Sequence, residues 1–551
     1  MNRFGTLAIA IMLMAALLVL PQAASAQATS SGVTGMDPAR VRELVALARA
    51  NYAEGQAKPT DPQKSLEERA LARPVMKLTV DEAVKRALDN NIELSVERLN
   101  PTLSELSWES VRAAYVPTFG STLNTTASNP LPTSLLNGGT NVTNKTANWN
   151  FNIAKLLPWY GSTVTAQFNN SRTDTTSSFA TLNPQYTTQL QGVFTQPLLR
   201  NFRIDNNRQQ LKTTNIARQV SDLTLRKVVI NTIASTRNAY WDLLAAIRAI
   251  DAARQSLDLA ERLVLDNQTR VEVGTLAPMD VISAQAEAAT RRQTLTTAEA
   301  TRRTAELVLK RLIVPNTEDE LWKATIDPTD LAKVDPRPIS LETAVLAALK
   351  DRTDVVTARK NLQSTDINIM YLKNQMLPAL DASATLGTRG LGGNTYIREG
   401  GVVVGSVPGG WPDAFNMMRK FDYPNWTVGV TLSYPIGNST QDVAFARAKV
   451  QYQQQVSQLH ALELTIATEV TNAALSVEST LKRLEAGRAA RTLSEKRLEN
   501  EQSKFEVGMS TNFFVVQAQR DLLDAQISEL RAALDYQKAL VEFERVQLAS
   551  R

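Results

Sequence analysis

The sequence offers few side chains that could do chemistry. Cysteine is absent from all 551 residues, and the single histidine, His460, stands in a helical run. Without cysteine there are no disulfides, thiolate metal sites or cysteine nucleophiles. One histidine cannot supply a multi-histidine zinc site, and its place in a helical run argues against a histidine-based triad. A lone histidine in a helix is far more often a surface or seam residue than a ligand or a base.

The acidic residues and glycines supply no catalytic arrangement either. Asp81 and Glu82 are adjacent in sequence, so on a helix they point apart, which favours capping and solvation over shared acid–base chemistry. No glycine-rich phosphate loop of the Walker type is present. We therefore expect a protein that is not an enzyme and that has no cofactor, no catalytic residue and no metal site.

Composition and charge narrow the class further. The chain has 60 basic and 55 acidic residues and a net charge of +5, with the two signs mixed along the sequence. No Lys/Arg run of the kind that binds nucleic acid is present, so we expect no nucleic-acid partner. Aromatic residues make up only 6%, which suits long helices with small-residue seams better than thick globular cores.

The N-terminus has the pattern of a secretory signal peptide over residues 1–26. Arg3 precedes an apolar run over 7–20 and an Ala-Ser-Ala site that ends at Ala26. No later apolar stretch is long enough for a transmembrane helix. We expect a protein that is periplasmic, secreted, or a β-barrel in an outer membrane. Residues 27–77 are expected to be an N-terminal extension and linker.

The elements that would position any site are two very long helical runs. Residues 209–273 contain no Gly or Pro, and apolar residues recur every three or four positions. At about 1.5 Å per residue this run would be about 95 Å long, far beyond the ordinary helix of about 10–14 residues. A turn at 273–278 leads to a second run over 279–314. By itself this pattern is also typical of a helical hairpin in a coiled-coil protein.

The same hairpin returns in the second half of the chain, which indicates an internal duplication. The runs 437–507 and 513–548 repeat the pattern. Each repeat is also expected to open with a helix of about 35 residues. The helix starts in the segment 78–88 or 339–349 and ends at Pro117 or Pro378. Thr79 is a plausible N-cap that forms a capping box with Glu82.

After each proline the apolar period changes from about 3.6 to 2, which predicts strands. The clearest strand is 426–434, in which apolar residues alternate with Thr, Gly and Ser. We expect partner strands at 380–386, 119–125 and 190–197, with polar loops between them. An extra hairpin over 148–169 either adds strands or lies above a membrane.

Apolar residues on one face and small polar residues on the other suit lipid outside and water inside. An open sheet of four to six strands cannot span a bilayer, because every backbone group must be paired there. Closure needs about eight strands or more. The sequence therefore predicts a barrel shared between subunits. The alternative is a small soluble β-domain capping a coiled coil.

These residues resemble the outer membrane efflux protein family, the TolC-like channels, over about 78–548. Paired features carry the resemblance: the opening helices, the Val116-Pro117 and Leu377-Pro378 junctions, the strands ending in Gln196-Pro197 and Tyr434-Pro435, and the Val-Gly turns before Ala284-Gln285 and Ala518-Gln519. The resemblance implies a homotrimer in the outer membrane of a Gram-negative bacterium, with a porin-like β-barrel and a long α-helical barrel in the periplasm. It also implies a periplasmic adaptor (membrane fusion) protein and an inner-membrane pump as partners.

In this family the hairpin tips carry the adaptor contact. The resemblance places that contact on six residues: Val273, Gly274, Thr275, Val507, Gly508 and Met509. Some members close the periplasmic tip with aspartate rings and an arginine link. Asp280 matches a gate-side aspartate, but the second hairpin has Phe514, Gln517 and Ser510 at the corresponding positions.

These residues argue against an acidic constriction. We hypothesise that Phe514, one per subunit, forms an apolar ring that gates the tip, with Asp280 and Gln517 as further gate candidates. The alternative is that Phe513 and Phe514 only pack the hairpin.

The expected architecture is mainly α with a small β part, in two tandem repeats. Repeat one spans 78–314, with its β part at about 117–198 and its tip at 273–280. An equatorial linker follows at 315–338. Repeat two spans 339–551, with its β part at about 379–436 and its tip at 507–514. About four strands per subunit, or six, would join a trimeric barrel in contact with outer membrane lipid. The expected function is the outer membrane channel of a tripartite efflux or type I secretion system; the alternative is a periplasmic structural coiled-coil or adaptor protein.

Overall fold

A computed structural model describes residue 46 and residues 74–130, 142–273, 277–330, 340–399, 402–437, 439–507 and 509–547. The expected signal peptide and nearly all of the expected extension lie outside these ranges. Among the described helices, none is both long and apolar enough to cross a membrane. The chain divides into two units, which are described separately; Leu106–Asn215 and Gln363–Tyr452 belong to the first, and Ile216–Leu362 and Gln453–Arg551 to the second.

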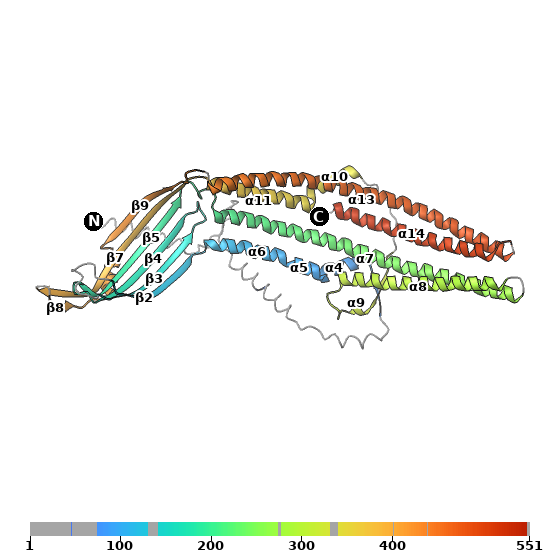
Figure 1. The fold of residues 1–551 in the computed structure, drawn as a ribbon, viewed down its shortest axis with the longest axis horizontal. Coiled ribbons are helices and arrows are strands. Elements are labelled where there is room, and N and C mark those ends of the chain that lie inside the picture. Colours follow the sequence, from blue (N-terminus) through green and yellow to red (C-terminus); the bar gives the residue numbers. More distant parts are fainter. Residues whose placement is uncertain are drawn as a thin grey trace, which may run out of the picture. The chain divides into compact units, whose positions relative to one another are not determined.

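The first unit is built on one antiparallel sheet (Figure 1). Its strands are β2 (Thr118–Ser128), β3 (Asn144–Leu156), β4 (Thr163–Thr175), β5 (Leu182–Pro197), β7 (Ala379–Glu399), β8 (Val402–Val407) and β9 (Pro424–Ser433). The order is β2-β3-β4-β5-β7, after which β7 pairs with β9 along its first half and with β8 near its end. Where β9 pairs with β7, the described sheet is therefore six strands wide.

The extra hairpin of the first repeat is part of this sheet. β3 and β4 lie between β2 and β5 and pair with both, so the larger of the two expected strand counts applies. The region between the strands of the second repeat is also more than the expected polar loop, because it contains β8 and a helix, α12 (Trp411–Lys420). Glycines at 409 and 410 hid this helix in the sequence pattern.

The second unit holds most of two helical hairpins of equal dimensions. α7 (Asn206–Glu272) and α13 (Thr440–Glu506) have 67 residues each, and α8 (Pro278–Ile313) and α14 (Asn512–Gln547) have 36 each. One constant sequence offset relates all four pairs of helix ends. The predicted duplication is thus present in the fold, with two tandem repeats in a mainly helical chain.

The opening helix of each repeat is interrupted, in contrast to the expected continuous helix of about 35 residues. The first consists of α4 (Val80–Asn90), α5 (Ile92–Glu97), α6 (Leu99–Arg112) and η2 (Ala113–Tyr115), and the second of α10 (Leu341–Asp351) and α11 (Thr353–Gln375). The first breaks fall at corresponding positions of the two repeats, Asn91 and Arg352, which are extended with ψ of 122° and 132°. Asn91 breaks the helix because its side chain accepts a hydrogen bond from the Leu94 amide and so starts a new helix.

The helix starts as predicted at Thr79. Its hydroxyl accepts from the Glu82 amide at 3.3 Å, and the Glu82 carboxylate accepts from the Thr79 amide at 3.1 Å. This reciprocal pair satisfies two of the amides that have no partner at a helix start.

The segment between the repeats is described up to Asp330 and packs on the helices. It contains α9 (Glu320–Lys323) and β6 (Thr325–Pro328), and β6 pairs in parallel with β1 (Val75–Leu78). The hydroxyl of buried Tyr240 lies 3.0 Å from the Leu78 oxygen and 2.9 Å from Asp330 Oδ2, and burial raises the pKa of this phenol. Strand β1, the linker and α7 thus share one hydrogen-bonded junction.

A buried ion pair at the end of α8 holds this linker. The Lys310 ammonium is 2% exposed; it lies 2.9 Å from Glu306 Oε1, donates to the Trp322 oxygen at 3.1 Å and also donates to the Ala324 oxygen. Glu306 in turn accepts from the Ile326 amide at 3.2 Å. All three ammonium hydrogens therefore have acceptors, so burial leaves no donor of this side chain unsatisfied.

We expect Lys310→Met to destabilise the helical unit by about 3–5 kcal/mol, because it leaves the Trp322 and Ala324 oxygens without their donor and leaves buried Glu306 with only Arg302, at 3.5 Å, as its cation. The matched control is Lys482→Met, which removes an exposed pair with Glu478 and should cost less than about 1 kcal/mol. Thermal unfolding followed by far-UV circular dichroism compares the two. Equal midpoints for the two variants would mean that the buried pair contributes no more than a surface pair.

Candidate functional site

The two faces of the sheet have opposite character. Residues directly opposite each other on neighbouring antiparallel strands share a face, so the register assigns every strand residue to one side. One side, here called the apolar face, carries Phe119, Leu123, Trp149, Phe151, Ile153, Val164, Phe168, Leu190, Phe194, Leu380, Ala384, Leu386, Trp426, Val428, Val430 and Leu432. This set covers β2, β3, β4, β5, β7 and β9.

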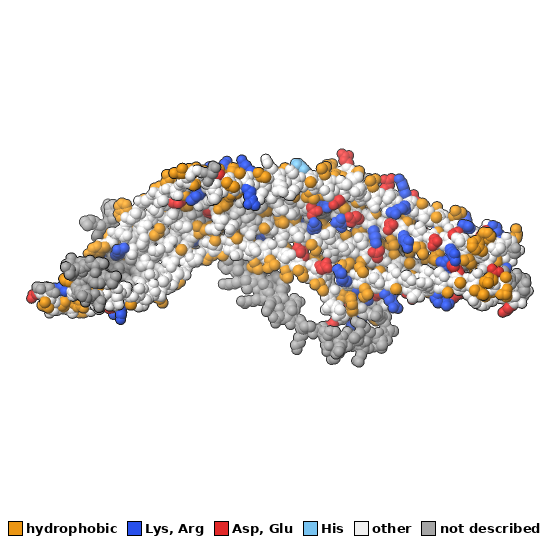
Figure 2. All heavy atoms as spheres, viewed as in Figure 1, with side chains coloured by type: hydrophobic (Ala, Val, Ile, Leu, Met, Phe, Trp, Pro, Cys, Tyr) orange, Lys and Arg blue, Asp and Glu red, His pale blue; other side chains and the backbone are white. Residues whose placement is uncertain are grey.

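The other side, here called the polar face, carries mostly small uncharged residues. It includes Thr118, Thr122, Asn124, Asn148, Asn150, Asn152, Thr163, Thr165, Gln167, Asn169, Gln189, Gln191, Thr195, Ser383, Thr385, Asn425, Thr427, Thr431 and Ser433. Between positions 381 and 389 of β7 the charged residues of this face are its two ends, Asp381 and Arg389. In the view of Figure 2, charged side chains are spread over the helices and are sparse over the sheet.

The apolar face is open rather than covered by a core. On β9 the side chains of Trp426, Val428, Val430 and Leu432 are 64–73% exposed. A water-soluble domain rarely exposes so large a contiguous apolar surface, and such surfaces mark membrane or protein contacts. Alternating apolar and polar residues on tilted strands is the pattern of a transmembrane barrel with lipid outside and water inside.

The sheet also has two free edges among the described strands. β2 pairs with β3 alone, and β9 pairs with β7 alone. In hydrocarbon these edge amides and carbonyls need partners, and six strands are too few to close on themselves. The arrangement can span a membrane only when other strands meet both edges.

The hairpin ends are the second candidate site. Of the six residues predicted to contact an adaptor, Val273, Val507 and Met509 are described, and all are strongly exposed, at 68%, 70% and 78%. Gly274, Thr275 and Gly508 lie outside the described residues. Exposed apolar side chains at the ends of long helices suit a docking contact.

The three gate candidates lie near the starts of α8 and α14, Asp280 and Phe514 in the first turn and Gln517 in the second. Asp280 is half-buried, and its backbone oxygen accepts from Asn267 Nδ2 at 3.4 Å. Phe514 is 51% exposed and meets Phe513 edge-on with 5.6 Å between ring centres. The Gln517 amide donates to Asp521 at 2.8 Å on its own helix. Neither phenylalanine is buried by its own hairpin in the single chain.

The two hairpins pack on each other just before their turns. Leu263 of α7 joins Leu498 and Phe505 of α13 and Val515 of α14 in one buried cluster. Arg270 reinforces it, because its guanidinium lies 4.2 Å from the Phe505 ring centre and donates to the Phe505 oxygen at 3.2 Å. Sequence reasoning missed this contact, although both residues stand within four positions of a Val-Gly turn.

A buried carboxylate further along α8 links the hairpins electrostatically. Glu287 is 6% exposed; it pairs with Arg291 of its own helix at 2.6 Å and with Arg520 of α14. The hydrogen bond from Arg520 lowers the pKa of the Glu287 carboxyl, against the opposing effect of desolvation. Sequence reasoning missed both contacts; the spacing of four residues could have indicated the pair with Arg291, whereas no local pattern points to the partner on the other hairpin.

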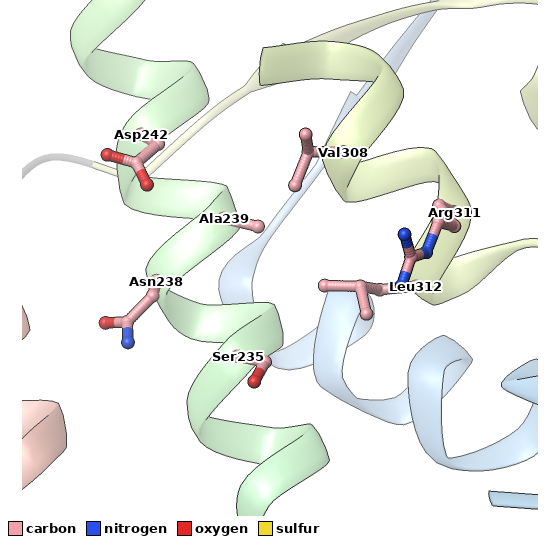
Figure 3. Close-up of a pocket in the computed structure, with 7 residues that line it drawn as sticks. All are labelled: Ser235, Asn238, Ala239, Asp242, Val308, Arg311 and Leu312. Atoms are coloured by element: carbon pink, nitrogen blue, oxygen red, sulfur yellow. The ribbon is translucent and has the colours of Figure 1, made fainter. Parts of the chain in front are cut away.

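The recess between α7 and α8 has no arrangement of catalytic groups. Its volume is about 390 Å³, and it is lined by Ser235, Asn238, Ala239, Asp242, Val308, Arg311 and Leu312 (Figure 3). Asp242 pairs with Lys538 at 2.5 Å, and Arg311 reaches Glu93 at 3.4 Å. Within the described residues no three His, Cys, Asp or Glu side chains are grouped to hold a metal.

We expect Glu287→Gln to lower the free energy of unfolding by about 3 kcal/mol, because Arg291 is left buried without its counter-charge. Arg520→Gln is the control: its side chain is half-exposed and the Glu287–Arg291 pair survives, so the cost should be below about 1 kcal/mol. Thermal midpoints from circular dichroism give the comparison, and an equal loss would contradict the buried role of Glu287.

The same pair predicts a pH dependence. The folded pKa of Glu287 lies below its unfolded value, so its stabilisation is complete above about pH 4.3 and is lost as pH falls through the folded pKa. Glu287→Gln should therefore show a shallower loss of stability on acidification than the wild type.

Comparison with known proteins identifies the type of fold. The family model described as outer membrane efflux protein matches residues 140–313 and 345–546, one segment in each repeat. This match confirms the family resemblance drawn from the sequence. The search of curated proteins finds no match.

Solved structures agree on the fold. The Campylobacter jejuni CmeC outer membrane channel aligns with a TM-score of 0.63 at 12% identity, over 96% of this chain and 95% of that one. The outer membrane protein VceC from Vibrio cholerae aligns with 0.62 at 13% identity, over 86% and 96%. The open state of the Neisseria gonorrhoeae MtrE outer membrane channel aligns with 0.57 at 17% identity, over 85% and 88%.

Proposed function

Because the chain belongs to the outer membrane efflux protein family, we propose that it is the passive exit duct of a tripartite efflux or type I secretion system. Family and fold neighbours are channel proteins of the outer membrane. The duct itself needs no catalytic group, since transport energy would be supplied by a partner. In this role the sheet of the protein would lie in the outer membrane of a Gram-negative bacterium, and its helices would lie in the periplasm.

The two-faced sheet is the observation that carries this proposal. Three copies would bring eighteen strands together, six from each, with β9 of one subunit meeting β2 of the next. Closure would then pair the free edges, turn the apolar face to lipid and enclose water with the polar face. A soluble coiled-coil protein would have no use for an exposed apolar face of this size.

The helical hairpins would continue the duct across the periplasm. Exposed Val273, Val507 and Met509 suit docking of a periplasmic adaptor, which would couple the duct to an inner-membrane pump. Near the same ends we propose a gate that includes Phe514, with Asp280 and Gln517 beside it. The exposure of Phe514 in the single chain leaves its ring available to face the lumen.

Neighbouring residues of β9 test the barrel. Val428→Arg places a charge on the apolar face opposite Ala384 and should cost about 2–4 kcal/mol near mid-bilayer, so folding into vesicles should fail or fall sharply. Thr427→Arg places the same charge on the polar face, opposite Thr385, where it should permit insertion but reduce single-channel conductance. The wild-type protein should form a trimer with pores in planar bilayers.

Equal insertion of the two arginine variants would contradict the proposed orientation of the faces. A wild-type protein that stays monomeric and water-soluble, without pore activity, would rule out the duct.

Phe514→Ala tests the gate. Removing an apolar ring from the constriction should raise the closed-state conductance, because a wider and wetter passage remains. Phe513→Ala, the neighbour that points elsewhere on the helix, should leave the conductance unchanged. Single-channel recording compares them, and an unaltered current in Phe514→Ala means that this side chain is not the constriction.

A further inference from the structure

Helix α12 lies on the apolar face of the sheet, toward the end of β7 that is farther from α11. It follows β8 and starts at Gly410, whose amide donates to Asp413 Oδ2 at 2.8 Å. It ends at Phe421 in the left-handed conformation, with φ of 61°. Its Ala414 and Met418 side chains are buried.

Two glycines of β7 form the seat of this helix. A Cβ atom at Gly390 would lie 1.7 Å from the Ala414 oxygen, and one at Gly392 would lie 2.3 Å from the Gly410 oxygen. Any other residue at these positions would push the helix off the strand. The close approach of backbone to backbone is therefore built into the sequence.

The side of the sheet on which α12 lies follows from the register. Gly390 and Gly392 continue the alternate positions of β7 that include Leu386, so they belong to the apolar face. Phe415 meets Phe168 of that face edge-on at 6.3 Å, and Trp411 Nε1 donates to Asn170 at 3.1 Å.

The outward side of α12 is polar. Among its residues Asp413, Arg419 and Lys420 are exposed, whereas Trp411 and Phe415 are partly covered. The helix thus replaces open apolar sheet by a charged surface where the apolar band ends. Further charged residues stand on this face near the same ends of β3 and β4, namely Lys145 and Arg172, the latter in an ion pair with Asp174 at 3.1 Å.

The distance along the strand fits a membrane boundary. The apolar band starts at Leu380, ten positions before Gly390. At about 3.3 Å per residue this span is about 33 Å along the strand, or about 25 Å along the membrane normal at a tilt of about 40°. That is the usual height of the apolar band in outer-membrane barrels.

We propose that α12 is an interfacial helix that lies in the head-group layer of the outer leaflet and binds phosphate-bearing lipid head groups through Arg419 and Lys420. Trp411 and Phe415 would then lie at the depth where aromatic side chains anchor membrane proteins. The inference rests on the proposed function, because it requires the apolar face to meet lipid.

Single cysteines test the depth of α12, since the chain has none of its own. Nitroxide labels are placed at Asn416→Cys on α12, Val430→Cys on the apolar face and Thr431→Cys on the polar face, in full-length protein reconstituted into vesicles. The spin relaxation of the label at 416 should be enhanced most by nickel chelated at lipid head groups. The relaxation of the label at 430 should be enhanced most by oxygen dissolved in the hydrocarbon. The relaxation of the label at 431 should be enhanced most by an aqueous nickel complex.

Each outcome separates the two proposals. If the label at 416 responds only to the aqueous complex, or like the label at 430 to hydrocarbon oxygen, α12 is not interfacial, although the barrel stands. If the label at 430 also responds only to the aqueous complex, the proposed membrane barrel itself fails.

Charge recognition is tested with a fluorophore at Asn416→Cys. Phosphatidylglycerol with a nitroxide head group should quench it at a tenfold to thirtyfold lower mole fraction than labelled phosphatidylcholine, as expected for two cations near the surface. R419Q/K420Q should abolish this preference. K496Q/R497Q, which removes two adjacent exposed cations on α13, should preserve it, and a preference that survives R419Q/K420Q overturns the assigned phosphate contact.

Discussion

Pairing of backbone groups at the sheet edges is the constraint on which the rest of this structure depends. The apolar face is suited to hydrocarbon, yet β2 and β9 each leave one edge free among the described strands. Hydrocarbon offers no water to satisfy those edges, and six strands are too few to close alone. A single chain in a membrane would therefore leave the backbone groups of two strand edges without hydrogen-bond partners. The proposed assembly of three copies rests on these unsatisfied hydrogen bonds as much as on family membership.

The helical part solves a different problem, which is to keep two very long hairpins in register with little apolar core. Its core clusters are separate patches, one near Tyr240, one near Tyr536 and one near Phe505. Buried charges add specificity between them, with Lys310 and Glu306 holding the linker and Glu287 joining α8 to α14. Such pairs contribute little net stability over an apolar contact, but sliding a helix would leave a charge buried alone. We therefore interpret these ion pairs as contacts that fix the register between neighbouring helices.

The duplication has been kept where geometry requires it and has diverged elsewhere. The hairpins retain identical lengths of 67 and 36 residues, because hairpins that end together must match along their whole length. In the sheet part the repeats differ: the first inserts β3 and β4, and the second inserts β8 and α12. The inserted pair β3 and β4 keeps the alternation of apolar and polar faces, so the sheet became wider without losing its two-sided character.

The sequence alone determined the helical hairpins, their duplication, the capping box at Thr79 and the alternating strands, because these follow from local periods of about 3.6 and 2 and from turn residues. It could not place the hairpin at 148–169, since strand order depends on hydrogen bonds between distant segments. It missed the breaks at Asn91 and Arg352; at Asn91 a short side-chain contact outweighs helical periodicity. The tertiary structure alone revealed α12 on its glycine seat, the Arg270–Phe505 contact and the Glu287–Arg520 pair. Each of these features either joins residues that are far apart in the chain or requires a close backbone approach that only glycine permits. A local sequence pattern indicates neither.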